Sequence, residues 1–126
     1  MDERRRHAKG ESRRREVLGD THVERSRAAE TEFSAELFDL VTRYAWGEVW
    51  TRPGLDTVTR RLLVLAMTVA LNREREFKLH LRAALADGVP RDMVKEVLLQ
   101  TAIYCGIPAA HSAFHDAAEV FAEFDA

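Results

Sequence analysis

The sequence lacks most features that mark secreted, membrane-spanning or thiol-dependent proteins. Its 126 residues include three prolines and a single cysteine, Cys105. One thiol excludes an internal disulfide, a CxxC redox pair and a zinc site built from several thiolates. The longest apolar stretch, Leu62–Leu71, is too short to cross a bilayer, and the charged N-terminus is unlike a secretory signal. These absences predict a cytoplasmic protein with no membrane partner.

An excess of positive charge is also absent, because the formal net charge is −2. No overall positive field therefore favours nucleic acid. Arginines do crowd residues 2–18, but acidic residues interleave them and no aromatic residue is present for base stacking. We expect a solvated, salt-bridged helix here and no nucleic-acid partner.

The composition is otherwise that of a soluble globular protein, with 46% hydrophobic and 32% charged residues. A chain of this length has room for one domain with a small core, and oligomerisation would bury more surface. We predict a single domain over residues 1–126, in which residues 1–33 form a charged, helical N-terminal arm.

All periodic segments indicate helices, since no segment alternates apolar and polar residues as a half-buried strand does. Asp20 and His22 are expected in a turn, and Ser34 is expected to cap the helix after it. Residues 46–55 hold both tryptophans, a proline and two glycines, which predicts an ordered loop. The expected helices cover residues 2–18, a short polar segment after residue 22, the segment after Ser34, and residues 57–72, 73–87, 90–104 and 108–124.

Glu76 and His80 are four residues apart, so a helix would place them on one face. His80 falls at the edge of an apolar stripe made by Phe77, Leu81, Ala84 and Leu85. There a histidine can be partly buried and still reach a cleft, and a neighbouring carboxylate would fix its tautomer and raise its basicity. The same spacing also suits an ordinary surface pair, and the pattern leaves both interpretations open.

Three arginines could each hold a carboxylate through two parallel hydrogen bonds. Arg52 lies in the tryptophan-rich segment, and Arg60 and Arg61 precede the apolar run. Alternatively they are solvated, or they pair with a carboxylate such as Glu48, Asp56 or Glu74.

Glu48 lies between Trp46 and Trp50, whose indoles would lower the local dielectric and favour the protonated form of its carboxyl group. Glu48 would then be a possible proton donor. Alternatively it pairs with Arg52.

The remaining candidates have weaker patterns. Cys105, at a helix end, is expected to be apolar filler rather than a nucleophile. His111 and His115 have a spacing that can bind metal, but no third ligand with helpful spacing accompanies them.

Several segments together resemble the carboxymuconolactone decarboxylase family of the alkylhydroperoxidase-like superfamily. They are RREVLGDTHV (14–23), TRYAWGEVWTRPGLD (42–56), TRRL (59–62) and the run from Glu76 to Phe114. The resemblance covers nearly the whole chain, and WGEVWTRPGL is its most specific part.

The chain departs from the superfamily's disulfide reductases, which use a CxxC pair followed by a histidine. Arg73 and Glu76 stand where those cysteines would be, while His80 keeps the histidine position. Peroxide reduction by dithiol exchange is therefore impossible, and a histidine with a carboxylate suits proton transfer. His111 stands where decarboxylases of this type are expected to have asparagine, which would alter substrate preference if this position lines the pocket.

The resemblance implies an alkylhydroperoxidase-like helical fold and a ring-forming homo-oligomer built on trimers, commonly a hexamer. It also implies decarboxylation of 4-carboxymuconolactone to 3-oxoadipate enol-lactone and CO2 in protocatechuate breakdown, part of the β-ketoadipate pathway. No cofactor or metal is expected, because the unsaturated lactone itself accepts the electrons. The apolar run Leu62–Leu71, apolar almost all round, would then be buried in the core or against another subunit.

The site hypothesis assigns proton transfer or carbonyl polarisation to His80, oriented by Glu76, with Glu48 as a second candidate acid. The substrate-binding residues are expected to be Arg52, Arg60, Trp46 and Trp50. Two alternatives stay open: another lactone-processing lyase or isomerase on the same scaffold, and a non-catalytic helical binding module whose arginine-rich arm contacts acidic partners.

Overall fold

The computed structural model describes residues 2–126, which form seven α-helices and one π-helix. The expected all-helical fold class is confirmed, and no strand occurs within the described residues. The chain divides into two compact units, one reaching residue 57 and the other covering residues 58–126. Each unit is described by itself.

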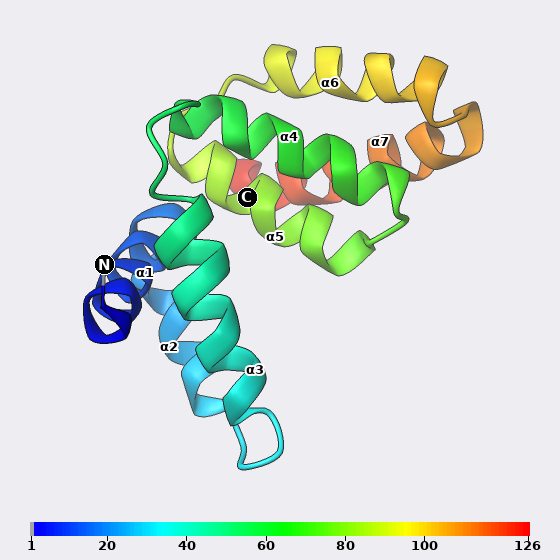
Figure 1. Cartoon of the computed structure of the whole chain (residues 1–126). Coiled ribbons are helices and arrows are strands. Elements are labelled where there is room, and N and C mark those ends of the chain that lie inside the picture. The colour runs from blue at the N-terminus through cyan, green and yellow to red at the C-terminus, as the bar shows by residue number, and fades with distance from the viewer. Residues whose placement is uncertain (1) are drawn as a thin grey trace. The chain divides into compact units, whose positions relative to one another are not determined.

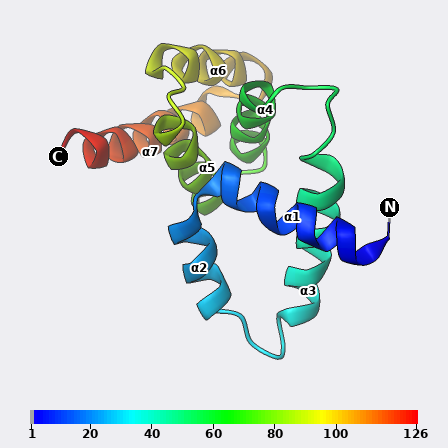
Figure 2. The same ribbon diagram turned by 90° about the vertical axis from the view of Figure 1, so that its left-hand side faces the viewer.

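The first unit contains α1 (Glu3–Leu18), α2 (Asp20–Ala28), α3 (Ala35–Leu40) and the π-helix η1 (Val41–Val49). The α3 helix continues directly into η1, and α1 crosses η1 and packs against it (Figures 1 and 2). This unit therefore extends beyond residue 33, the end of the predicted N-terminal arm. Ser34 precedes α3 as expected, although its side chain makes no capping hydrogen bond.

The start of α2 corrects one expectation. Asp20 and His22 lie in the first turn of α2 and not in a turn between helices. Gly19, with a φ of 89°, makes the change of direction alone, because glycine adopts positive φ readily. Asp20 then suits the first turn of α2, since negative charge is favourable near a helix N-terminus.

Two glycines allow α1 and η1 to approach closely. A Cβ atom added to Gly10 would lie 1.8 Å from the carbonyl oxygen of Thr42, and one added to Gly47 would lie 2.4 Å from the carbonyl oxygen of Arg6. Both distances are far shorter than any van der Waals contact. The backbones therefore touch at this crossing, and a side chain at either position would separate the helices.

Arginines of α1 add specific bonds to this contact. Arg13 donates from Nε to the carbonyl oxygen of Trp50 at 3.0 Å and from Nη2 to Oγ1 of Thr57 at 2.6 Å. Elsewhere Arg15 pairs with three acidic residues, Glu11, Asp20 and Glu24. The prediction of a salt-bridged helix is confirmed, and α1 also holds the segment that carries the tryptophans.

The expected loop over residues 46–55 is wrong in its first part. Trp46–Val49 belongs to η1, and the N–H of Trp50 donates to the carbonyl oxygen of Ala45 at 3.0 Å, a bond across five residues. Gly47 does not break the helix. Its missing side chain instead allows α1 to approach η1 closely. Turns begin at Trp50, and Pro53 and Gly54 lie in the turns that follow.

The second unit contains α4 (Thr57–Ala70) apart from its first residue, α5 (Glu74–Ala86), α6 (Arg91–Tyr104) and α7 (Ile107–Asp125). All four expected helices are present, with ends within about two residues of those expected. Gly88 and Gly106, with φ values of 90° and 105°, follow α5 and α6 as the stop signals predict.

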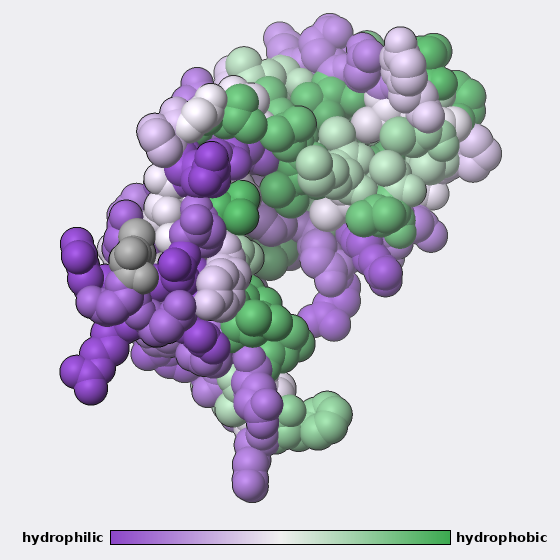
Figure 3. Space-filling view, viewed as in Figure 1, coloured by the Kyte–Doolittle hydropathy of each residue, from purple (hydrophilic) through white to green (hydrophobic). Residues whose placement is uncertain are grey.

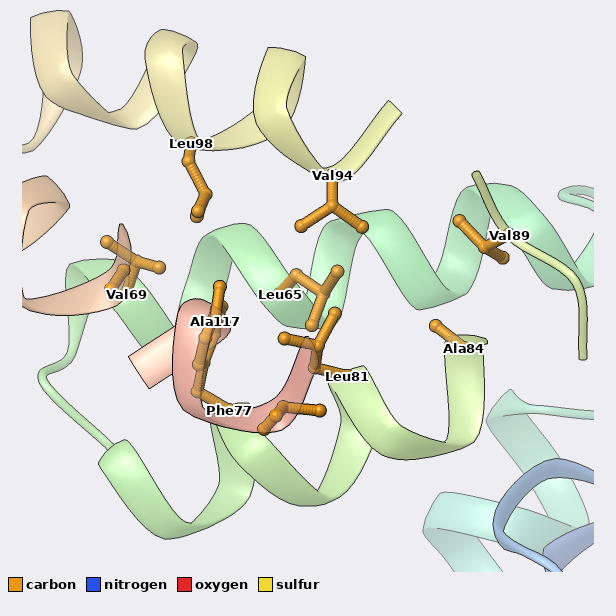
Figure 4. Close-up of a cluster of buried hydrophobic side chains, with 11 residues drawn as sticks. Leu65, Val69, Phe77, Leu81, Ala84, Val89, Val94, Leu98 and Ala117 are labelled. Atoms are coloured by element: carbon orange, nitrogen blue, oxygen red, sulfur yellow. The ribbon is translucent and has the colours of Figure 1, made fainter. Parts of the chain in front are cut away.

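One side chain cluster forms the core of this unit (Figure 4). Its largest fully buried members are Phe77 and Leu81 from α5, Leu65 from α4, Leu98 from α6 and Val120 from α7. The stripe predicted on residues 73–87 is therefore confirmed as the face of α5 that packs on the core.

The apolar run of α4 is buried on one side only. Leu65 and Val69 face the core, whereas Leu63 and Met67 are 40% and 55% exposed. Hydrophobic side chains gather on the surface over α4 and α6, where an apolar groove of about 570 Å³ runs between the two helices (Figure 3). Burial of this face against another subunit stays a prediction. Within residues 2–126, no helix is both long and apolar enough to span a membrane.

Candidate active site

The α5 helix positions His80 at the border between core and surface. Phe77, Leu81 and Ala84 are buried on the core side of α5, and His80 is half-buried beside them. This confirms the expected placement of His80. Glu76 lies one turn earlier, in the acidic and exposed first turn of α5, where its charge suits the helix N-terminus.

Two neighbouring arginines open α4 in different environments. Arg60 is half-buried, whereas the side chain of Arg61 is only 2% exposed and its Nε lies 3.3 Å from the carboxylate of Asp87. Arg61 therefore forms an ion pair, as the alternative interpretation expected. Its partner is Asp87, which was not among the carboxylates expected to pair with it. Asp87 follows α5, 26 residues away, so only the packing of α4 against the end of α5 reveals this pair.

The tryptophans of the first unit form a buried pair. The ring centroids of Trp46 and Trp50 lie 4.9 Å apart with 25° between the planes, and the residues are 6% and 9% exposed. Such offset stacking is favourable and makes a rigid apolar surface. Arg52 is exposed in the turns that follow η1.

Glu48 is half-buried, and its carboxylate accepts a hydrogen bond from Nη1 of Arg6 on α1. The two expectations for Glu48 involved its indole neighbours or Arg52, and neither included Arg6. Arg6 and Arg13 are therefore the residues around this segment that sequence reasoning missed. The charged pattern of α1 gave no signal that could distinguish them from the other arginines.

The other candidates lie at the surface. Cys105 is exposed at the end of α6 and borders the apolar groove, so the expectation of core filler is wrong. His111 and His115 are exposed on α7, and Nε2 of His115 lies 3.1 Å from Glu119. In the part of the chain that the structure describes, no group of three or more histidine, cysteine or acidic side chains is arranged to hold a metal ion.

These features define a class: small, all-helical proteins with a half-buried histidine on an amphipathic helix and a carboxylate one turn before it. The model of the carboxymuconolactone decarboxylase family matches residues 35–119. The chain belongs to this family, and the match extends from α3 into α7.

One similar protein extends the match into α1 and α2. The chain is 44% identical over 121 residues to 4-carboxymuconolactone decarboxylase of Acinetobacter baylyi, covering 96% of this chain and 90% of that protein. It is 40% identical over 96 residues to nitrosuccinic acid decarboxylase of Metarhizium robertsii, covering 76% and 67%. A 4-carboxymuconolactone decarboxylase sequence from Pseudomonas putida is 42% identical over 48 residues, which are 38% of this chain and all of that sequence.

Proposed function

We propose that this protein is a carboxy-lyase that converts 4-carboxymuconolactone to 3-oxoadipate enol-lactone and CO2, in protocatechuate breakdown and without a cofactor. The observation that carries the proposal is 44% identity to the Acinetobacter baylyi decarboxylase over nearly the whole of both chains. The family match supports decarboxylation in general.

The chemistry follows from the substrate. When the ring carboxylate leaves as CO2, the electron pair of the broken bond moves through the ring C=C bond to the lactone carbonyl. The resulting dienolate is protonated at the carbon α to that carbonyl, which gives the enol-lactone. The protein must bind two carboxylates, stabilise the developing oxyanion and supply one proton.

The proposal assigns the proton or the polarisation of the carbonyl to His80, with Glu76 as its orienting group. Its half-buried position supports this role, because an imidazole there is shielded on one side and can still contact a ligand. Glu48 stays the second candidate acid, although its carboxylate is already engaged by Arg6, and we therefore rank His80 first.

Substrate anchoring is assigned to Arg60 and Arg52, which would each bind a carboxylate. Trp46 and Trp50 would form an apolar wall that excludes water, and their buried stack supports such a rigid surface. An apolar surround favours loss of CO2, because the negative charge spreads out in the transition state.

A second candidate reaction is decarboxylation of nitrosuccinic acid, favoured by the 40% identity to the Metarhizium robertsii enzyme. Both substrates lose CO2 beside a group that accepts electrons, a nitro group in one case and an unsaturated lactone in the other. Parallel assays with the two substrates decide between them.

The test is the loss of ultraviolet absorbance when 4-carboxymuconolactone is generated in situ from protocatechuate. His80→Ala is expected to lower kcat by about 10²–10⁴-fold, the range for loss of a general acid. The control is His115→Ala on α7, an exposed histidine with no assigned role, which is expected to keep normal turnover. A folded His80→Ala protein with near-normal kcat would rule out the main assignment.

In the same assay the anchoring residues act on KM. Arg60→Ala and Arg52→Ala are each expected to raise KM by about 10–100-fold, because a charge-assisted hydrogen bond contributes about 1.5–3 kcal/mol. Unchanged KM in both variants would contradict the anchoring role. A folded wild-type protein that consumes neither substrate would favour the lactone-isomerase or binding-module alternatives.

The proposal also includes three structural expectations. They are an alkylhydroperoxidase-like arrangement of a single domain, a homo-oligomer of three or six copies, and a cytoplasmic location. The exposed apolar side chains of α4 support association of copies, since burying them is favourable.

A further inference from the structure

The first unit encloses a polar pocket that the proposed decarboxylation does not use. The pocket, of about 340 Å³, lies among α1, α2, α3 and η1. Three basic side chains line it, and two lie near carboxylates: Nε2 of His7 lies 3.7 Å from Asp39, and Arg27 pairs with Glu11. The third, Arg14, has no carboxylate within 4 Å in residues 2–126, and Glu11 and Glu30 attract it only from a greater distance.

Arg14 is buried, with 9% of its surface exposed. Within residues 2–126, one of its five N–H groups, on Nη2, donates a hydrogen bond, to Oγ of Ser26 at 3.0 Å, and Nε is buried with no hydrogen-bond partner among these residues. Its guanidinium carbon lies 5.8 Å from the centre of the Phe38 ring. Burial lowers the pKa of Arg14, as expected for a cation withdrawn from water.

A buried guanidinium with so few bonds is unfavourable, because burying a charge costs free energy unless a partner compensates for it. An apolar residue on the buried face of α1, like Val17 one turn later, would avoid this cost. The cavity beside Arg14 supplies room for the missing partner.

We propose that this pocket, named here the Arg14 pocket, binds a small organic carboxylate. The planar guanidinium fork matches the two oxygens of a carboxylate, which is the reason arginine recognises this group so often. The pocket volume suits a ligand with few non-hydrogen atoms. Glu30 also lines the pocket and makes no ion pair within residues 2–126, so its charge opposes the ligand and limits affinity. This site is distinct from the proposed site at His80 and does not depend on decarboxylation.

The test is calorimetric titration of the full-length protein with succinate, against sodium chloride at equal ionic strength. Wild-type protein is expected to bind succinate saturably with Kd on the order of 1 mM, a weak affinity typical of few contacts. Arg14→Gln should weaken binding by about 10–100-fold, and Arg14→Lys should retain part of it. Glu30→Gln should tighten binding by about two- to threefold, because it removes an opposing surface charge.

Two control variants separate this site from others. Arg5→Gln removes an exposed arginine of the same helix and should leave binding unchanged. His80→Ala should also leave it unchanged, and this distinguishes the Arg14 pocket from the proposed substrate site. If Arg14→Gln does not fold, as judged by circular dichroism, Glu30→Gln on the exposed rim carries the test.

Three results would overturn the inference. The first is no saturable binding by wild-type protein, and the second is equal binding by a folded Arg14→Gln protein. The third is binding that is lost in His80→Ala but kept in Arg14→Gln. An absence of tightening by Glu30→Gln would also overturn it. Tighter binding of inorganic phosphate than of succinate would overturn the assignment to carboxylates.

Discussion

Gly10 lies where the backbones of α1 and η1 touch, and its substitution has a predictable cost. Gly10→Ala would add helix propensity, a gain of about 1 kcal/mol. Its Cβ would lie 1.8 Å from the Thr42 carbonyl oxygen, and such overpacking costs typically 1–3 kcal/mol or more when backbone must move. We expect a net loss of stability, measured as a lower urea midpoint.

The matched control is Gly54→Ala, because a Cβ added there meets nothing within 4 Å. Its effect should stay within about 0.5 kcal/mol. Equal midpoints for Gly10→Ala and wild-type protein would mean that the two helices can separate without cost.

At single positions, the sequence predicted what depends on local periodicity and missed what depends on distant partners. The half-buried position of His80 follows from the stripe that Phe77 and Leu81 define on the same helix. The bond between Arg6 and Glu48 spans 42 residues, and no local pattern indicates which of many arginines reaches that carboxylate. The same reason hid the Arg61–Asp87 pair.

Between helices, ion pairs connect α7 to the rest of the second unit. Lys78 and Arg82 on α5 bond to Glu119 and Glu123 at 2.6 and 2.8 Å, and Arg91 on α6 bonds to Asp125 at 2.6 Å. These basic partners lower the pKa of three acids on α7, which are Glu119, Glu123 and Asp125. These three acids are therefore ionised more easily in the folded state than in the unfolded state.

The sign of the pH dependence follows from these lowered values. Stability from the pairs is complete above the ordinary pKa values of 4.5 for Glu and 3.8 for Asp, and it is lost as pH falls through the lower folded values. The triple variant Glu119→Gln, Glu123→Gln and Asp125→Asn should show a smaller fall in urea midpoint with acid than wild-type protein. Because these groups are exposed, 1 M salt should reduce the difference.

Glu96→Gln provides the comparison, since Glu96 is exposed on α6 and makes no ion pair within 4 Å in residues 2–126. The urea midpoint of the Glu96→Gln protein should fall with acid as much as that of wild-type protein. An acid profile of the triple variant that superimposes on the wild-type profile would show that these pairs add nothing to stability.

Helix ends were predictable wherever glycine or proline fixes them. Gly88, Pro90 and Gly106 separate α5, α6 and α7 as expected, because their backbone preferences act locally. The segment after Ala45 was not predictable in the same way. By composition, Gly47 predicts a helix break. In the structure it instead allows α1 and η1 to cross closely, and this contact depends on residues far apart in the sequence.

For the whole molecule, the sequence predicts association of copies through family resemblance and an apolar helix. Sedimentation velocity at micromolar concentration is expected to give a trimer or hexamer. Met67→Lys on the exposed side of α4 should weaken association by about tenfold or more, since a charge in an apolar interface is poorly compensated. Ala86→Lys, at an exposed position of α5, is the control, and a wild-type protein that sediments only as monomer would contradict the prediction.

Both tryptophans, Trp46 and Trp50, belong to the first unit, and the second unit contains none. Intrinsic fluorescence at long excitation wavelength therefore comes from tryptophans of the first unit, while ellipticity reports on helices of both units. If the two optical signals trace a single denaturation curve, the units unfold cooperatively; if they diverge, each unit has its own stability.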